Sequence, residues 1–224
     1  MMEDTTMQKN NHNNAAASGR EEAMIKVDNL DVTINGKNIV HDMSLTVPKG
    51  KITTIIGPNG CGKSTTLKAI CRILPVTGGK IELMDKNIKD YSYREFARKL
   101  AILTQSNNIQ MKLTVQELVT FGRFPYSGNH VTEEDMAIVE RAIQYMELAP
   151  FRDRFIDELS GGQRQRALIA MVIAQDTEYV LLDEPTNHLD IDHATNMMKI
   201  VRRLCDELGK TVILVLHEIN YAAF

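Results

Sequence analysis

One short loop constrains this chain more than any other feature of its sequence. It reads Gly57-Pro58-Asn59-Gly60-Cys61-Gly62-Lys63-Ser64-Thr65, which contains the pattern Gly-x-x-x-x-Gly-Lys-Ser. A short β-branched segment, 52–56, precedes the loop, and a helical apolar pattern follows it through Leu67 and Ile70 to Leu74. A glycine-rich turn that only caps a helix does not need the strand before it. The strand–loop–helix context therefore predicts a phosphate-binding P-loop.

The chemistry of this loop follows from its residue types. Glycines let the backbone wrap around phosphate groups, and consecutive N–H groups point inward at the N-terminus of the following helix. Lys63 supplies a cation for the β- and γ-phosphates, and the Ser64 hydroxyl is placed for Mg²⁺. Thr65 can reach the α-phosphate.

A second pair of polar residues follows a short apolar strand pattern at 179–182. Asp183 is predicted to hold Mg²⁺, directly or through water, and Glu184 is a candidate general base for an attacking water. Because successive residues of a strand alternate sides, the two carboxylates are expected to do different jobs. Taken alone, the pair could also be surface acids at a strand end, and it is the P-loop that favours the metal site.

The segment Leu159-Ser160-Gly161-Gly162-Gln163 narrows the class further. Together with the P-loop, Gln105 after an apolar strand (101–104), Asp183–Glu184, Leu189–Asp190 and His217, it resembles the ATP-binding cassette (ABC) ATPases. The resemblance covers nearly everything from Ile25 to Phe224, with the motifs in the family's order and spacing.

The resemblance implies a role for each residue. Gln105 is similar to the family's hinge glutamine, which touches Mg²⁺ and the attacking water, and His217 to its switch histidine on the γ-phosphate. Asp190 is similar to the loop that joins two sites across a dimer. Ser160, Gly162 and Gln163 are similar to the family's signature loop. That loop contacts the γ-phosphate of an ATP molecule bound to a second subunit.

One of these implied roles also follows from the residues themselves. The turn Ser160–Gly161–Gly162 opens a helix, so it is a second anion-binding N-terminus. One chain has one P-loop and one such turn. Two sandwiched ATP molecules would therefore need a head-to-tail pair of chains, either a homodimer or a pair with a second ABC subunit.

Alternating strands and helices predict an α/β fold with a mainly parallel sheet. The resemblance implies a P-loop ATPase of the ABC type, with an added antiparallel β layer and a helical subdomain at about 106–175 that carries the signature. Capping boxes at Ser92/Glu95 and Thr114/Glu117 mark two helix starts, and a third helix is expected near Thr132. Residues 1–22 are polar and Asn-rich, so we expect a disordered tail before an ABC domain at 23–224.

Composition excludes several classes. The net charge is −3, which argues against a polybasic protein that binds nucleic acid or a membrane surface. The longest apolar run, Ala167–Ala174, is far short of a membrane span. The first residues do not form a secretory signal, and the three cysteines fit neither a disulfide framework nor a metal site. These features favour a reducing, cytoplasmic setting, and the resemblance to the ABC ATPases implies a peripheral protein at the cytoplasmic face of the membrane.

Residues 114–126 carry the clue to the transported substrate. Their element Gly122-Arg123-Phe124-Pro125, with the P-loop sequence, resembles the ATPases of bacterial iron(III)–siderophore importers and their vitamin B12-type relatives. The resemblance implies membrane permease subunits bound near 106–126 and, indirectly, an extracytoplasmic substrate-binding protein. A plain capped helix and turn is the alternative for this segment.

Two departures from the family pattern bear on activity. Ile34 stands where the family has an aromatic residue that stacks on adenine, which predicts weak nucleotide affinity and poor base selectivity. Family members also continue further past the histidine that His217 resembles, so we expect a shortened C-terminal end of the domain. A non-catalytic nucleotide-binding fragment is therefore one alternative, and a soluble ABC switch without transport is another.

Cys61 is expected to be a reactive thiol inside the phosphate loop, although it could equally be a small apolar filler.

Overall fold

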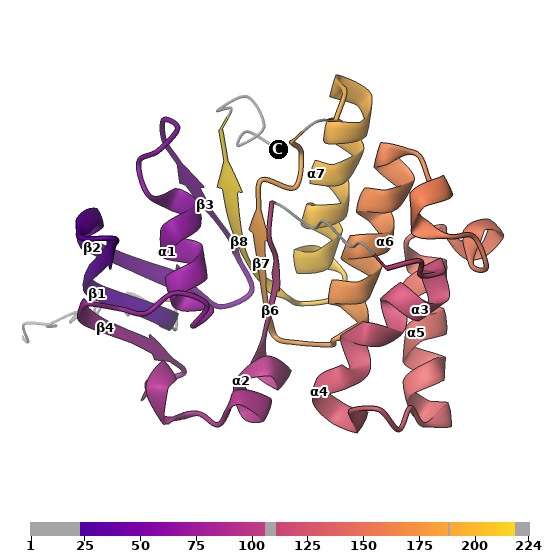
Figure 1. Cartoon of the computed structure of the whole chain (residues 1–224), viewed down its shortest axis with the longest axis horizontal. Helices are drawn as coiled ribbons and strands as arrows, with labels where there is room; N and C mark the ends of the chain where they lie inside the picture. The colour runs from indigo at the N-terminus through magenta and orange to yellow at the C-terminus, as the bar shows by residue number, and fades with distance from the viewer. Residues whose placement is uncertain (1–22, 106–110, 188, 218–224) are drawn as a thin grey trace, which may run out of the picture.

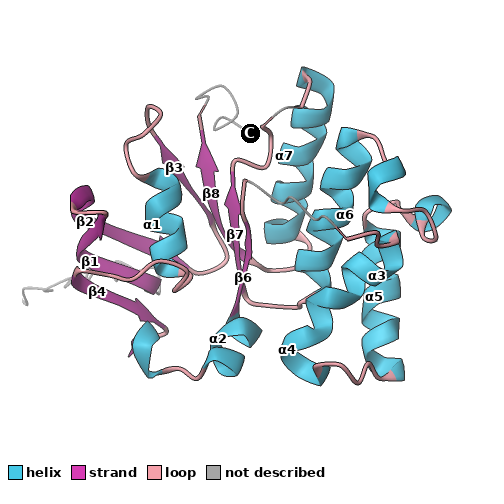
Figure 2. Cartoon of the chain, viewed as in Figure 1, coloured by secondary structure: helices cyan, strands magenta, loops and turns pink. Residues whose placement is uncertain are grey.

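The computed structural model describes residues 23–105, 111–187 and 189–217. Three layers follow one another across the molecule: an antiparallel sheet with one helix, a parallel sheet, and a group of helices (Figure 1). Figure 2 shows that the helices gather on one side of the parallel sheet, apart from α1 (Lys63–Ile70), which lies between the two sheets, and α2 (Tyr93–Lys99) below them. The expected mixture of a parallel core, an antiparallel layer and a helical part is confirmed.

The parallel sheet has the strand order β3-β8-β7-β6. Its strands are β3 (Ile52–Ile56), β6 (Leu100–Leu103), β7 (Tyr179–Asp183) and β8 (Thr211–Leu216). Alternate side chains of these strands enter different cores. Tyr179 and Leu181 pack toward α1, whereas Val180 and Leu182 pack toward the helices on the other face. Both faces of β7 and β8 are therefore covered, which explains why these two central strands are almost wholly apolar and lack polar alternation.

The antiparallel sheet has the order β2-β1-β4-β5. It consists of β1 (Ala23–Ile34), β2 (Lys37–Pro48), β4 (Gly78–Leu83) and the short β5 (Lys86–Asn87). The hairpin of β1 and β2 begins where Ile34 pairs with Lys37. The first half of β2 is mostly exposed and polar and shows no alternation, so the sequence carries no strand signal there.

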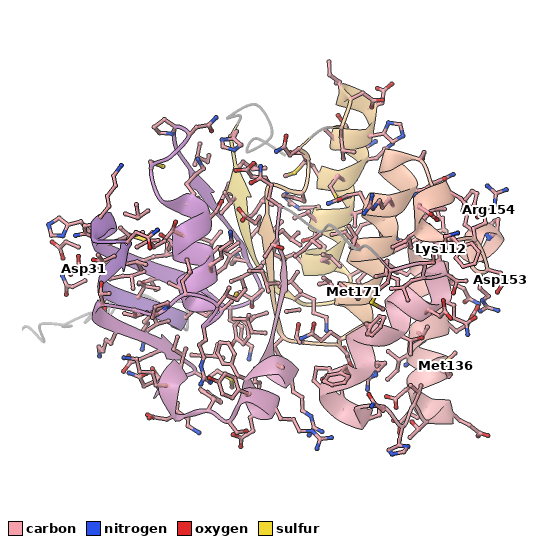
Figure 3. All side chains as sticks on the ribbon, viewed as in Figure 1. Asp31, Lys112, Met136, Asp153, Arg154 and Met171 are labelled. Atoms are coloured by element: carbon pink, nitrogen blue, oxygen red, sulfur yellow. The ribbon has the colours of Figure 1, made fainter. Side chains whose placement is uncertain are left out.

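The helical layer contains α3 (Val115–Thr120), α4 (Phe124–Ser127), α5 (Glu133–Tyr145), α6 (Gly161–Ala174) and α7 (Ile191–Asp206). All three expected helix starts are confirmed as capping boxes, at Ser92, Thr114 and Thr132. Figure 3 marks the two ends of the molecule, with Asp31 on the antiparallel sheet and Arg154 beyond the helices.

The first helix is shorter than its apolar pattern predicts. Helix α1 ends at Ile70 and does not continue to Leu74. Arg72 takes a left-handed φ of 60°, and the N–H of Ile73 donates to the carbonyl of Lys68 at 2.9 Å. This is a Schellman-type ending, which closes the helix although apolar residues continue beyond it. The division into a tail and a helical subdomain stays a prediction, and residues 1–22 lie outside the described part.

Arg123 is a buried cation that joins three of the helices. Its Nε donates to Asp135 Oδ1 at 2.8 Å and its Nη1 donates to the carbonyl of Ala174 at 2.9 Å. Ser127 and Thr132 donate to the other oxygen of Asp135. These bonds, first that from Ser127, hold the pKa of Asp135 well below its ordinary value. The carboxylate therefore stabilises the fold at neutral pH, and this contribution is lost as pH falls through the pKa of the folded state.

No helix in the described part of the chain combines the length and the apolar character needed to cross a lipid bilayer.

Replacing Asp135 by alanine leaves the Arg123 guanidinium buried without its counter-ion. We expect Asp135→Ala to lower the free energy of unfolding by about 3–5 kcal/mol, because an unpaired buried charge is strongly destabilising. Urea denaturation checks this, with Glu134→Ala, an exposed residue on the same helical turn, as the control. Equal losses for the two variants would contradict a structural role of the ion pair.

Candidate nucleotide site at the carboxyl edge of the parallel sheet

The P-loop follows β3 and reaches the N-terminus of α1. Gly62 caps this helix with a φ of 94°, a conformation that favours glycine. A Cβ at this position would lie 2.9 Å from the carbonyl oxygen of Ile39, so the hairpin of β1 and β2 packs directly against the loop. Both the backbone angle and the close neighbour therefore require glycine here.

Lys63 and Ser64 begin α1 and face the loop interior. The Lys63 ammonium is held over the loop, where it donates to the carbonyls of Gly57 at 2.7 Å and Pro58 at 2.9 Å. Phosphate oxygens are stronger, charged acceptors for the same donors. The Ser64 hydroxyl donates to Asp183 Oδ1 at 2.7 Å and so connects the P-loop to the end of β7.

Asp183 carries the observation that bears on a metal ion. The side chain is buried, and its Oδ2 has no hydrogen-bond partner among the described residues. A buried carboxylate oxygen without a partner is costly, and a cation is one way to satisfy it. Carboxylate and hydroxyl oxygens are the ligands that Mg²⁺ prefers. The donor set of Asp183 and Ser64 therefore fits Mg²⁺ coordinated together with phosphate oxygens.

Glu184, the next residue, has different partners. Its φ of 53° is left-handed, which costs a non-glycine residue roughly 1–3 kcal/mol. One carboxylate oxygen accepts from Gln105 Nε2 at 2.8 Å and from Asn187 Nδ2 at 3.3 Å. The other oxygen contacts His217 Nε2. Donors from three different loops thus hold this buried carboxylate in one orientation.

These residues surround one cavity of about 540 Å³. Its lining includes the following residues that the sequence predicted: Asn59, Gly60, Gly62, Lys63, Ser64, Thr65, Gln105, Glu184 and His217. Lys37 and Ile39 also line it, and sequence reasoning missed both. Asn187 was missed too. An amide three residues after Glu184, in the turn that follows β7, was the signal that could have identified it.

The remaining predicted residues of the P-loop, together with Asp183, adjoin this cavity without lining it, whereas the signature residues and Asp190 lie elsewhere. Ser160 caps α6, where its hydroxyl accepts from the N–H of Gln163 at 3.3 Å. Asp190 caps α7 and accepts from the N–H of His193 at 2.8 Å. Neither these residues nor Gly162 line the cavity described above. The predicted site residues thus fall into two separate groups in the chain.

The sequence profile of the ABC transporter family matches residues 40–187, more than half of the chain. The chain belongs to the ABC transporter family. This cassette is 48% identical over 200 residues to the petrobactin import ATP-binding protein YclP of Bacillus subtilis (strain 168), covering 89% of this chain and 79% of that protein. It is 43% identical to the iron(3+)-hydroxamate import ATP-binding protein FhuC of the same organism, covering 89% of this chain and 75% of that protein.

The fold agrees with this assignment. The solved dimeric structure of MJ0796, a bacterial ABC transporter cassette, superimposes with a TM-score of 0.78 at 30% identity, covering 89% of this chain and 90% of that one. As an ABC cassette, the chain is an ATP-binding protein of the ATPase class.

Alkylation of the exposed Cys61 thiol is expected to inhibit ATP turnover. Burial raises the pKa of the Cys71 and Cys205 thiols, which slows their reaction. We expect a maleimide at neutral pH to label Cys61 first and to block ATP turnover, and Mg-ATP to protect. Peptide mapping of the labelled site checks this, with Cys61→Ala as the unlabelled control. Labelling that nucleotide does not slow would place the phosphates elsewhere.

Ile34, which the family resemblance puts at the adenine position, pairs with Lys37 of the cavity wall. No aromatic ring is among the described residues that line the cavity. We expect little discrimination between ATP and GTP. Ile34→Tyr should tighten ATP binding by about tenfold, because stacking on a base is worth roughly 1–3 kcal/mol. Fluorescence titration with both nucleotides checks this, with Ile34→Leu as the control. A strong preference of the unmodified chain for ATP would contradict it.

Proposed function

We propose that this chain is the ATP-hydrolysing subunit that energises import of iron(III)–siderophore complexes, acting as a peripheral protein on the cytoplasmic face of the membrane. The observation that carries the ATPase part is the buried Glu184, held by Gln105 and His217 at the wall of the P-loop cavity. The names of the relatives support the substrate class. YclP is named for petrobactin import, FhuC for iron(3+)-hydroxamate import, and FepC of Escherichia coli (strain K12) for ferric enterobactin transport.

The residues divide the chemistry between them. Lys63 and the N–H groups of the P-loop bind the phosphates, with Thr65 near the α-phosphate. Ser64 and Asp183 would hold Mg²⁺, which when bound neutralises phosphate charge. Glu184 accepts a proton from the attacking water, and Gln105 orients that water. His217 contacts the γ-phosphate side of the cavity and fixes the Glu184 carboxylate.

The second set of residues implies two chains. Ser160, Gly162 and Gln163 lie at a helix N-terminus, which attracts anions, yet these residues lie outside the cavity that holds the P-loop. A head-to-tail pair places the signature turn of each chain over the nucleotide of the other, with Asp190 at the junction. Hydrolysis then depends on chain concentration.

A groove between α2 and α4 is the surface that we assign to the membrane permease. Its cavity measures about 720 Å³, and Tyr93 and Phe124 line it while remaining 79% and 59% exposed. Arg94 and Arg98 of α2 donate to the carbonyl of Pro125 at 2.9 and 3.0 Å, which fixes the two walls of the groove together. Part of the contact region expected from the sequence, 106–110, lies outside the described residues.

Uptake of a radioactive iron(III)–siderophore tests the proposal. The gene is expressed in a bacterium that lacks its own siderophore-import ATPase but keeps a matching permease and binding protein. We expect uptake to be restored, and to be lost in Glu184→Gln, because an amide cannot accept the proton from water. A variant in the groove, Phe124→Asp, should lose uptake while its purified form keeps ATP turnover.

Two results would contradict the proposal. Restoration of vitamin B12 uptake alone would show that the substrate class is wrong. Full uptake with Glu184→Gln would show that Glu184 is not the general base. Tyr126→Phe, in the same segment as Phe124, is the control for expression and folding.

A further inference from the structure

His193 lies against the first turn of α6 although it belongs to α7. A Cβ added to Gly162 would lie 2.4 Å from Cδ2 and 2.9 Å from Nε2 of the His193 ring. No real side chain tolerates such contacts, so the imidazole occupies the space where any other residue at position 162 would put its side chain. A methyl group at position 162 would therefore force the half-exposed His193 ring to move.

The other side of the same ring is fixed by Asp190. Nδ1 of His193 lies 2.7 Å from Asp190 Oδ1, and the backbone N–H of His193 donates to the same oxygen at 2.8 Å. These two hydrogen bonds, with the backbone bond the larger effect, hold the pKa of Asp190 below its ordinary value. Asp190 is therefore a carboxylate that can only accept, so Nδ1 of His193 carries the proton. The opposite edge of the ring, Cδ2 and Nε2, then faces the first turn of α6.

We propose that His193 is a positioning residue that joins the signature turn to the Asp190 loop, so that both interface elements of one chain meet the second chain as one unit. This inference rests on the proposed two-chain function, and it concerns neither nucleotide binding by a single chain nor proton transfer. His193 touches no residue of the P-loop cavity among its described contacts.

The exposure of the pair argues against a role in stability alone. The side chains of His193 and Asp190 are 53% and 67% exposed. Ion pairs and hydrogen bonds at such positions add little to folding, because water and salt screen them. Asp190 would also still cap α7 through the backbone N–H without the imidazole. What the ring adds is a rigid spacer between two loops, beside a cavity of about 380 Å³ that Gly162, Leu189 and His193 line together.

Three variants separate positioning from folding. His193→Ala removes both contacts. His193→Asn keeps an N–H donor near the position of Nδ1 but removes most of the ring beside Gly162. Asn196→Ala, one turn further along α7 in the same cavity lining, is the matched control. Each purified full chain is assayed for ATP hydrolysis over a range of chain concentrations, for ATP binding, and for thermal unfolding.

We expect His193→Ala to lower turnover per chain by about tenfold at the concentration that gives half the maximal wild-type rate, since small misplacements of positioning groups cost this much or more. ATP binding by the single chain and the unfolding midpoint stay at wild-type values. His193→Asn regains part of the rate, and Asn196→Ala behaves as wild type. Unchanged concentration dependence in His193→Ala would overturn the inference, as would an equal loss in Asn196→Ala.

A spectroscopic measurement tests the linkage directly. Two-dimensional NMR of the imidazole nitrogens should show the Nδ1–H tautomer in the wild type. Gly162→Ala should shift the tautomer balance, because the added methyl group displaces the ring from Asp190. Identical imidazole spectra in the two proteins would overturn the contact between the signature turn and His193.

Failure of the inference is distinguishable from failure of the proposed function. If wild-type turnover does not rise with chain concentration, the two-chain ATPase proposal fails, whatever the His193 variants do. If wild-type turnover rises with concentration and His193→Ala rises identically, only the role of His193 is overturned.

Discussion

Parallel pairing of β3, β8, β7 and β6 is the constraint on which the nucleotide site depends. In a parallel sheet the carboxyl ends of all strands meet at one edge, and ligands bind in the crevice outside that edge. The P-loop follows β3, His217 follows β8, Asp183 ends β7, and Gln105 lies just beyond β6. Residues separated by more than a hundred positions therefore meet around one cavity without any long loop. The Ser64–Asp183 hydrogen bond closes this arrangement by joining the P-loop to the central strand.

The two cores that cover this sheet hold its edge in place. One core packs α1 and the antiparallel sheet against one face, and the other packs α6 and α7 against the opposite face. The first core packs the β1–β2 hairpin against the P-loop. The carbonyl of Ile39 therefore lies close to Gly62, and Lys37 lines the nucleotide cavity. The second core positions α6, and with it the signature turn, at a distance from that cavity.

Electrostatics then separates the roles within the chain. The N-termini of α1 and α6 both carry partial positive charge, which attracts anions. Of these two, only the N-terminus of α1 adjoins the cavity. Carboxylates with different partners share the end of β7: Asp183 is connected to the P-loop hydroxyl, whereas Glu184 is held by amide and imidazole groups. Arg123, buried and paired with Asp135, ties the helical layer together beneath the groove that α2 and α4 form.

The sequence by itself determined the P-loop, the capping boxes, the strand pattern and the identity of most cavity residues, because each depends on residue types at short fixed spacing. It did not determine the end of α1, where the left-handed Arg72 closes the helix before its apolar pattern stops, nor the polar half of β2. Only the tertiary structure decided that Lys37, Ile39 and Asn187 reach the site and that His193 fills the space beside Gly162. Those contacts join segments that are distant in the chain or held by a turn, and such packing leaves no periodic signal in the sequence.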